Sequence, residues 1–527
     1  MLYSVFSALA SICYLFAAAL GARFFIHMFQ LNSYKPKVQL KWVKKNSRAY
    51  LGCHLALFAA SVLCFAFIKT EAGFAVTAGC FCAAFLVSGL TKLPKRSYKT
   101  PLKYTKRVIR LIVTLFVILI LPLLVPVIFG AELSVLAISI CSLWLLLLPL
   151  LILFANMLNR PLELSINKMY IRDAKRILKS CPSLIVIGIT GSFGKTSVKY
   201  FLDTLLSVRY NVLKTPGNFN TPLGVVKTIR GELRAIHDIF LCEMGAKNVG
   251  DIREICDIVH PKHGIITSVG PMHLESFKTI DNVRKTKFEL ADSLPQDGLL
   301  FLNMDDENIQ AANHPHPHIA YGIDDHSGYY VTDLRISERG SEFTLHAPDG
   351  KSCEYKTALI GRHNVVNICG AIAVSNSLGI SLEELRPAVR RLESVPHRLQ
   401  LINRGDYSVI DDAYNSNPSG TKAALEALSM TTGMKILVTP GMIELGEMEY
   451  ELNRQFGVDA AAVCDFVALV GEKQTKPIYD GLSSAGFPED KIYVAQSLQD
   501  AMHKVYSLTS DGRRKIILLE NDLPDNY

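Results

Sequence analysis

The 527-residue chain lacks any pair of cysteines in a CxxC spacing, and its twelve cysteines are scattered. Half of them lie in or next to apolar stretches, where Cys80 and Cys82 share a single stretch. Disulfide frameworks and zinc sites depend on closely spaced cysteine or histidine sets. The sequence therefore gives no support to a disulfide-stapled protein or a zinc centre. It also lacks internal repeats and low-complexity tracts.

Acidic residues are missing from two basic segments. Residues 35–48 hold six lysines and arginines, residues 92–110 hold eight, and neither basic group is interrupted by Asp or Glu. The chain has a net charge of +8, and these two segments contribute +14 of it, which leaves −6 for the remainder. The rest of the chain is thus mildly acidic, so the sequence predicts no nucleic-acid partner. The basic segments suit anionic lipid headgroups instead.

Long apolar stretches fill the first third of the chain. Overall, 49% of residues are hydrophobic and the mean hydropathy is +0.23. Five stretches, each of roughly the 20 residues that a helix needs to cross a bilayer, occupy about residues 2–29, 50–68, 72–90, 111–130 and 133–157. No basic region precedes the first, so a cleavable signal peptide is not indicated, and it would leave four stretches unexplained. We predict an α-helical membrane region over residues 1–158 with about five spans.

The charge pattern predicts an orientation for these spans. Basic loops stay in the cytoplasm, and the two short links at 69–71 and 131–132 are nearly free of charge. Five spans then place the N-terminus outside and everything after Arg160 in the cytosol, as expected for an integral protein of a bacterial cytoplasmic membrane. Charged residues are nearly absent at mid-span, which argues against a transport path.

The sequence pattern changes after the apolar region. Asn159 and Pro161 favour a helix start, and we predict an amphipathic linker helix over 159–182. Short β-rich runs then alternate with helical stretches, which predicts a mostly parallel sheet with helices on both faces. We expect one α/β domain over 183–395 and a second, Rossmann-like one over 396–527.

A phosphate-binding loop opens the first of these domains. "VIGITGSFGKTSVKYFLD" begins at Val186 and leads from a strand through a glycine-rich turn to a helix, although the strict P-loop pattern requires glycine where Ile189 stands. Such a turn offers backbone N–H groups to a polyphosphate. Lys195 is expected to reach the β- and γ-phosphates and Thr196 to ligate Mg²⁺.

Two further residues follow strands of the same predicted sheet. Glu243 ends the run "IFLCE", where a carboxylate faces a metal bound beside the first strand. His273 follows "GIITSVG", at the sheet edge where open α/β sheets bind ligands.

Taken in order, these motifs resemble the Mur ligase family, the ATP-dependent enzymes that join amino acids to cell-wall precursors. The family's loop is T-G-x-x-G-K-T and needs no glycine at position 189. The closest branch is MurF, which adds the D-alanyl-D-alanine dipeptide. The motifs that carry the resemblance are "GITGSFGKTS", "GNFNTPLGV", "EMGA", "VGPMHLESF", "TKFEL", "LNMDDENI", "GRHNVVNICGAIAV", "HRLQL", "IDDAYNSNPSG" and "GMIELGE".

The resemblance implies a set of site residues. Catalytic roles fall to Lys195, His273 and Lys287, with Lys287 carbamoylated. ATP would be bound by Thr190, Gly191, Ser192, Gly194, Lys195, Thr196, Ser197, Asn303, Asn364, Arg398 and Asp412. Two Mg²⁺ ions would be held by Thr196, Glu243, His273 and Lys287, and substrate by Asn218, Asn220, Thr221, Asn415 and Asn417.

The implied reaction activates a substrate carboxylate as an acyl phosphate and joins it to an amino acid or dipeptide, on a cell-envelope precursor at the cytoplasmic membrane face. Two features depart from the MurF pattern: apolar stretches replace its N-terminal substrate domain, and "IILLENDLPDNY" replaces its "KGS"-like stretch. The acceptor, the amine and the oligomeric state therefore stay open. A membrane-attached poly-γ-glutamate-type ligase and a nucleotide-sensing membrane scaffold are the alternatives.

Overall fold

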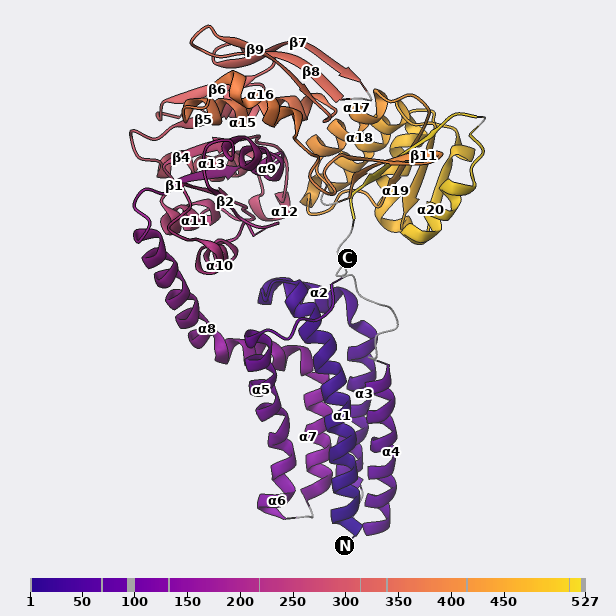
Figure 1. The fold of residues 1–527 in the computed structure, drawn as a ribbon. Coiled ribbons are helices and arrows are strands. Elements are labelled where there is room, and N and C mark those ends of the chain that lie inside the picture. The colour runs from indigo at the N-terminus through magenta and orange to yellow at the C-terminus, as the bar shows by residue number, and fades with distance from the viewer. Residues whose placement is uncertain are drawn as a thin grey trace. The chain divides into compact units, whose positions relative to one another are not determined.

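The computed structural model describes residues 2–67, 70–91, 100–130, 133–217, 219–312, 314–337, 340–413, 416–510 and 512–522. It divides into two compact units, visible in Figure 1. The helical unit comprises residues up to Lys168, and the α/β unit comprises Met169–Asp522.

The helical unit is built from helices that are mostly apolar, with the lysine-rich α2 as the exception. They are α1 (Leu2–Leu31), α2 (Pro36–Asn46), α3 (Arg48–Phe67), α4 (Glu71–Leu90), α5 (Lys106–Ile120), η1 (Leu121–Leu124), α6 (Val125–Phe129), α7 (Ser134–Leu146) and the first part of α8 (Leu148–Lys179). Three runs are long and apolar enough to cross a membrane: Val5–Leu31, Gly73–Leu90 and Lys106–Phe129. Two bent helix pairs raise the number to five if each counts as one span. The expected five spans are thus the upper end of the observed range.

The fifth predicted span, residues 133–157, is not one straight helix. Helix α7 ends at Leu146 and α8 begins at Leu148, with a bend of 79° between them. Pro149 is the physical reason, because it has no N–H to donate to a carbonyl of α7, whereas at the start of α8 the missing N–H costs little.

The helix start predicted at Asn159 is wrong. Helix α8 continues through Pro161 to Lys179, so the amphipathic segment predicted over 159–182 is largely the C-terminal part of a longer helix. Good helix formers on both sides of Pro161 outweigh the single lost hydrogen bond. The boundary between the two units falls inside this helix, after Lys168.

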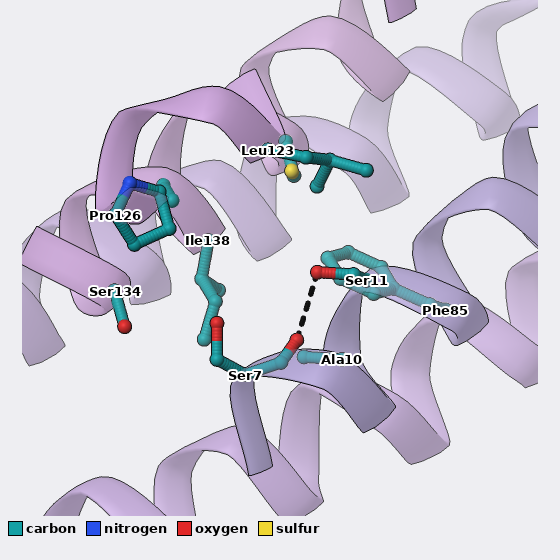
Figure 2. Close-up of a pocket in the computed structure, with 10 residues that line it drawn as sticks. Ser7, Ala10, Ser11, Phe85, Leu123, Pro126, Ser134 and Ile138 are labelled. Atoms are coloured by element: carbon teal, nitrogen blue, oxygen red, sulfur yellow. Dashed lines mark hydrogen bonds between the residues drawn. The ribbon is translucent and has the colours of Figure 1, made fainter. Parts of the chain in front are cut away.

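Neutral polar groups join the helices of the helical unit. His54 Nδ1 donates to the Tyr50 carbonyl at 2.9 Å, and Nε2 accepts from the hydroxyl of Ser88 on α4 at 2.8 Å. Figure 2 shows a small pocket between α1, α4, α6 and α7, where the Ser11 hydroxyl donates to the Ser7 carbonyl at 2.8 Å. These bonds satisfy polar groups that would otherwise be buried without partners.

The α/β unit contains a nine-stranded middle sheet in the order β2-β3-β1-β4-β5-β6-β7-β8-β9. The strands are β1 (Ile185–Thr190), β2 (Val212–Lys214), β3 (Ile239–Glu243), β4 (His263–Ile266), β5 (Leu300–Asn303), β6 (His318–Gly322), β7 (Tyr329–Ser337), β8 (Gly340–His346) and β9 (Ser352–Thr357). In the order along the sheet, all neighbouring strands from β2 through β1 to β7 pair in parallel. Strands β7, β8 and β9 form antiparallel pairs, which the sequence analysis missed.

Helices cover both faces of this sheet, as predicted. One face packs on α9 (Lys195–Leu206), α15 (Arg362–Ser377) and α16 (Leu382–Arg390). The other packs on α10 (Pro222–Glu232), α11 (Asp251–Val259) and α13 (Ile280–Phe288), with the short helices α12 (Leu274–Phe277), η3 (Ala291–Ser293) and α14 (Glu307–Gln310) beside them.

The C-terminal sheet has six strands in the order β10-β11-β15-β12-β13-β14. They are β10 (Gln400–Arg404), β11 (Tyr407–Asp412), β12 (Met434–Thr439), β13 (Phe466–Val470), β14 (Ile492–Ala495) and β15 (Lys515–Glu520). Its helices are α17 (Pro418–Ser429), η4 (Gly446–Met448), α18 (Glu449–Ala461), α19 (Glu472–Ser484), η5 (Glu489–Lys491) and α20 (Leu498–Ser507). The five strands β11, β15, β12, β13 and β14 pair in parallel, and β10 pairs antiparallel to β11.

Candidate active site

The phosphate-binding loop connects β1 to α9, and two of its glycines are required by geometry. Gly191 has φ +153° and Gly194 has φ +82°. A Cβ at Gly191 would lie 2.1 Å from the Thr267 hydroxyl, and one at Gly194 would lie 2.6 Å from Asn367 Oδ1. Only glycine fits at either position, so the loop keeps backbone N–H groups free of side chains, as a polyphosphate requires.

Ile189 explains why the strict P-loop pattern is not needed. It is fully buried within β1 and pairs with Glu243 of β3. Position 189 is therefore a strand residue that fills the core, outside the turn that faces phosphate.

Neighbouring strand ends hold the loop in place. The Ser192 hydroxyl donates to the Gly270 carbonyl at 3.1 Å and accepts from its N–H at 3.0 Å. The Phe193 N–H donates to the Ser268 hydroxyl at 2.7 Å. Thr190 donates to the Met244 carbonyl at 3.1 Å. These bonds fix the loop before any ligand binds, which reduces the entropy lost on binding.

Lys195 begins α9 and folds back over the loop. Its Nζ donates to the Gly191 carbonyl at 2.6 Å and to the Ser192 carbonyl at 3.3 Å. Burial lowers the pKa of Lys195 to about 8, although the Glu243 carboxylate opposes the shift. A polyphosphate would offer this amine better acceptors than neutral carbonyls.

Glu243 gathers the polar side chains of the site. Its Oε1 accepts from the Thr196 hydroxyl at 3.2 Å and from Asn220 Nδ2 at 3.1 Å. Its Oε2 lies 2.9 Å from Lys199 Nζ. Burial alone would raise the pKa of Glu243, but Lys199 and Lys195 hold it below its usual value. The structure thus brings together two predicted metal ligands, Thr196 and Glu243, and one predicted substrate residue.

Lys199 is a member of the site that the sequence analysis missed. Its side chain is fully buried and donates to the Gly217 carbonyl at 2.6 Å. It lies one helical turn after Lys195, on the face of α9 that also carries buried Val198 and Leu202. A lysine on that apolar face was the available signal, because a buried cation requires a partner.

His273 and Lys287 belong to two successive elements, since His273 precedes α12 and Lys287 lies on α13. His273 precedes α12 and shares a hydrogen bond through Nδ1 with Glu444. Burial lowers the pKa of His273, against the opposing effect of Glu444. Lys287 is fully buried on α13, its Nζ has no hydrogen-bond partner among the described residues, and burial holds its pKa well below the usual value. The described ranges contain no group of three His, Cys, Asp or Glu side chains that could hold a metal.

Two predicted nucleotide residues bond to main chain behind the loop. Asn303, at the end of β5, donates to the Thr267 carbonyl at 2.9 Å. Asn364, in the first turn of α15, donates to the Ile360 carbonyl at 2.8 Å. Asn367, one turn further along, lies against Gly194 and was missed. Ser197 lies in the first turn of α9.

Arg398 and Asp412 come from the C-terminal part of the unit. The charge of Arg398 lowers the pKa values of both Lys195 and Asp412. Asp412 accepts from the Leu399 N–H at 3.1 Å, and burial raises its pKa to about 6. Its neighbour in the next strand is Glu520, whose pKa burial raises well above the usual value. Glu520 is a second residue that the sequence analysis missed.

The predicted substrate residues divide into three groups. Asn220 contacts Glu243. Thr221 and Asn417 cap helices, accepting from the N–H groups of Gly224 at 3.3 Å and Gly420 at 3.0 Å. Asn218 and Asn415 lie outside the described residues.

Known proteins share this arrangement. Residues 189–375 match the Mur ligase middle domain, and residues 397–519 match the Mur ligase glutamate ligase domain. The UDP-N-acetylmuramoyl-tripeptide–D-alanyl-D-alanine ligase of Escherichia coli is 31% identical over 337 residues, which cover 60% of this chain and 73% of that protein.

The chain belongs to the Mur ligase family.

Solved structures of MurF resemble this Mur ligase as well. MurF from Acinetobacter baumannii has a TM-score of 0.62 and 27% identity, covering 68% of this chain and 77% of that one. MurF from Thermotoga maritima in complex with ADP has a TM-score of 0.60 and 25% identity, covering 68% and 80%. The match to the Bacillus subtilis ligase, 32% identical, spans 59% of its length.

Membership of the Mur ligase family indicates the type of reaction. Mur ligases are ATP-dependent peptide ligases of peptidoglycan synthesis, and they form ADP as they join an acid to an amino acid. The Gly191–Gly194 turn, Lys195, Thr196 and Glu243 all lie within the matched middle domain. Both matched domains lie inside the α/β unit.

Proposed function

We propose that this chain joins a D-alanyl-D-alanine-type dipeptide to the carboxylate of a UDP-N-acetylmuramoyl-tripeptide-type precursor and converts ATP to ADP and phosphate. The observation that carries the proposal is the contact between Thr196 and Glu243 at 3.2 Å beside the Gly191–Gly194 cradle. The 31% identical E. coli relative carries that activity in its name and supports the choice of substrates.

The chain's own residues supply positioning and charge. The backbone N–H groups of the loop and Lys195 would bind the β- and γ-phosphates, and Arg398 adds positive charge from the C-terminal sheet. Asp412 would accept from the ribose hydroxyls of the nucleotide. Phosphoryl transfer depends mostly on such positioning and electrostatic stabilisation.

Two Mg²⁺ ions fit the donor set. Thr196 and Glu243 would hold one, and His273 with a carbamate on Lys287 would hold the other. When bound, the ions neutralise charge on the transferring phosphoryl group.

Lys287 fits carbamoylation because its amine is buried and has no hydrogen-bond partner among the described residues, and because burial holds its pKa well below the usual value. A neutral amine adds to CO₂ and loses one proton, which creates a carbamate with two acceptor oxygens. An unmodified lysine would have no reason to leave Nζ unpaired in this interior.

The reaction proceeds in two displacements. A carboxylate oxygen of the precursor attacks the γ-phosphorus, and ADP leaves. The dipeptide amine then attacks the acyl carbon, phosphate leaves with the carboxylate oxygen, and the new amide loses one proton. Asn220, one hydrogen bond away from Glu243, is positioned to contact substrate near the transferring group.

We also propose that the helical unit anchors the enzyme in the cytoplasmic membrane. Three to five helices are long and apolar enough, and the basic residues of 35–48 and 92–110 favour the cytoplasmic side for both segments. The precursor would then be met at the inner membrane face.

The test uses the full-length chain in detergent micelles with ATP, Mg²⁺, UDP-muramoyl-tripeptide and D-alanyl-D-alanine. We expect ADP release that requires both substrates, equals the amide formed, and falls by about 10²–10³-fold in Lys195→Ala. Lys285→Ala, an exposed lysine in α13, is the matched control. Polymer formation from glutamate would favour the poly-γ-glutamate alternative, and nucleotide binding without amide would favour a scaffold.

A further inference from the structure

A contact between distant parts of the chain fixes the ring of His273. Glu444, in the loop between β12 and η4, bonds through Oε2 to His273 Nδ1, although 171 positions separate the two residues. Both side chains are mostly buried, with 15% of His273 and 28% of Glu444 exposed. The bond joins the middle domain to the C-terminal domain within the α/β unit.

Glu444 is itself held in place. Lys247 Nζ lies 2.9 Å from Oε1 and 3.1 Å from Oε2. The Glu444 carbonyl accepts from the Glu275 N–H at 3.3 Å. A Cβ at Gly446 would lie 3.3 Å from that same nitrogen, so this loop packs closely on α12. The carboxylate therefore has a fixed orientation toward the ring.

Both partners have unusual backbone conformations. His273 has φ +50° and Glu444 has φ +65°, in the left-handed region that non-glycine residues seldom adopt. This conformation is sterically unfavourable for a residue that carries a Cβ. Surrounding contacts must sustain this conformation, and residues of this kind cluster at functional sites.

The ring geometry leaves one nitrogen for a ligand. Nδ1 is taken by Glu444, and no hydrogen bond of Nε2 is present within the described part of the chain. Histidines that bind metals usually donate their other ring N–H to a carboxylate, which fixes the tautomer and strengthens the ligand.

We propose that Glu444 positions His273 for metal binding, with Nδ1 donating to the carboxylate and Nε2 directed to the divalent cation. This rests on the proposed function, in which His273 is a metal ligand. Because Glu444 belongs to the C-terminal domain, the second cation site is complete only while that domain is docked on α12. Docking and cation binding are thereby coupled.

Manganese titration tests this directly. The full-length chain in detergent, with a β,γ-methylene ATP analogue, is titrated with Mn²⁺ and free Mn²⁺ is measured by electron paramagnetic resonance. We expect two sites in the unaltered chain. Glu444→Ala should weaken one of them about 10–100-fold, Glu444→Gln should weaken it less, and the other site and the nucleotide affinity should keep their values.

The matched control is Glu447→Gln, an exposed carboxylate three residues further along the chain in η4, which should leave both sites unchanged. Lys247→Met removes only the partner of the carboxylate and should give an intermediate loss, which keeps the test valid if Glu444→Ala fails to fold. Where ligation is measurable, the KM for Mg²⁺ should rise while the KM for ATP stays.

Two results would overturn the proposal. One is equal weakening of both Mn²⁺ sites in Glu444→Ala, which would indicate a general structural role. The other is an unchanged Mn²⁺ affinity at both sites in Glu444→Ala. Neither of these Mn²⁺-binding results depends on ligase activity. An inactive chain that binds two Mn²⁺ ions would therefore contradict the proposed function without contradicting the role of Glu444.

Discussion

The helical unit and the α/β unit bury polar groups in different ways. Among the described residues, the helical unit buries a single Asp, Glu, Lys or Arg, which is Glu163. The α/β unit buries seven: Lys199, Glu243, Lys287, Glu289, Asp411, Asp412 and Glu520. Burying a charge is costly unless it is paired or used. The α/β unit therefore holds charged groups in its interior, some of them paired as Lys199 is with Glu243, whereas the helical unit relies mainly on neutral polar groups.

Among the changes expected to distinguish the two units, replacement of Gly191 should have the largest effect on stability and on ADP binding. In Gly191→Ala the new Cβ would lie 2.1 Å from the Thr267 hydroxyl, so the loop must shift. We expect a loss of about 1–3 kcal/mol in the free energy of unfolding of the α/β unit and loss of ADP binding, measured by thermal unfolding and calorimetry. Gly231→Ala, a helical glycine with open space around it, is the control. Unchanged ADP affinity in Gly191→Ala would exclude the loop as the phosphate site.

A decrease in pH should have a smaller effect on stability and on ADP affinity, and Asp412 is the group through which it acts. Its folded pKa of about 6 lies above the usual value of 3.8, so the folded state favours the protonated form. Stability from this group is fully present below the unfolded pKa and is lost as pH rises to 6. The proposed nucleotide contact has the opposite pH dependence, because the ionised carboxylate would accept from ribose hydroxyls more strongly than the protonated acid.

We therefore expect ADP affinity to fall as pH decreases through 6, by up to about tenfold per pH unit. Asp412→Asn should flatten that part of the profile, whereas exposed Asp406→Asn should leave it unchanged. Fluorescence titration of ADP between pH 5 and 8 measures both. Parallel profiles for Asp412→Asn and the unaltered chain would remove Asp412 from the nucleotide site.

The smallest effect is expected in the helical unit. Gly52 lies in α3, and a Cβ added there would have no neighbouring heavy atom within 4 Å. Alanine at this position should raise stability by about 0.5–1 kcal/mol, because glycine loses more conformational freedom in a helix. Ligation rates should not change. A measurable loss of activity in Gly52→Ala would show that the helical unit takes part in the chemistry.

Much of the α/β unit follows from local sequence. Apolar β-runs and glycine turns predicted the parallel strands and the loop, because both depend on residues close in the chain. The antiparallel strands β7 to β9 were missed because runs such as "YYVTDLRIS" expose alternate residues and depend on long-range pairing. In the helical unit, the apolar composition predicted the helices. It did not predict the bend between α7 and α8, which depends on the single residue Pro149.

The site was predictable to the extent that its residues lie in motifs. Lys195, Thr196 and Glu243 come from such motifs, and the structure places them together. Glu444 and Glu520 approach the site from the C-terminal domain, and no local pattern indicates their partners. Tertiary contact alone assigns them.

An isotope experiment tests the central claim that ATP activates a carboxylate. The precursor carries ¹⁸O in its terminal carboxylate, and the full-length enzyme converts it with ATP and the dipeptide. The account predicts that each released phosphate contains one ¹⁸O atom, transferred through the acyl phosphate and detected by mass spectrometry. Phosphate without ¹⁸O, formed at the same rate as amide, would contradict it.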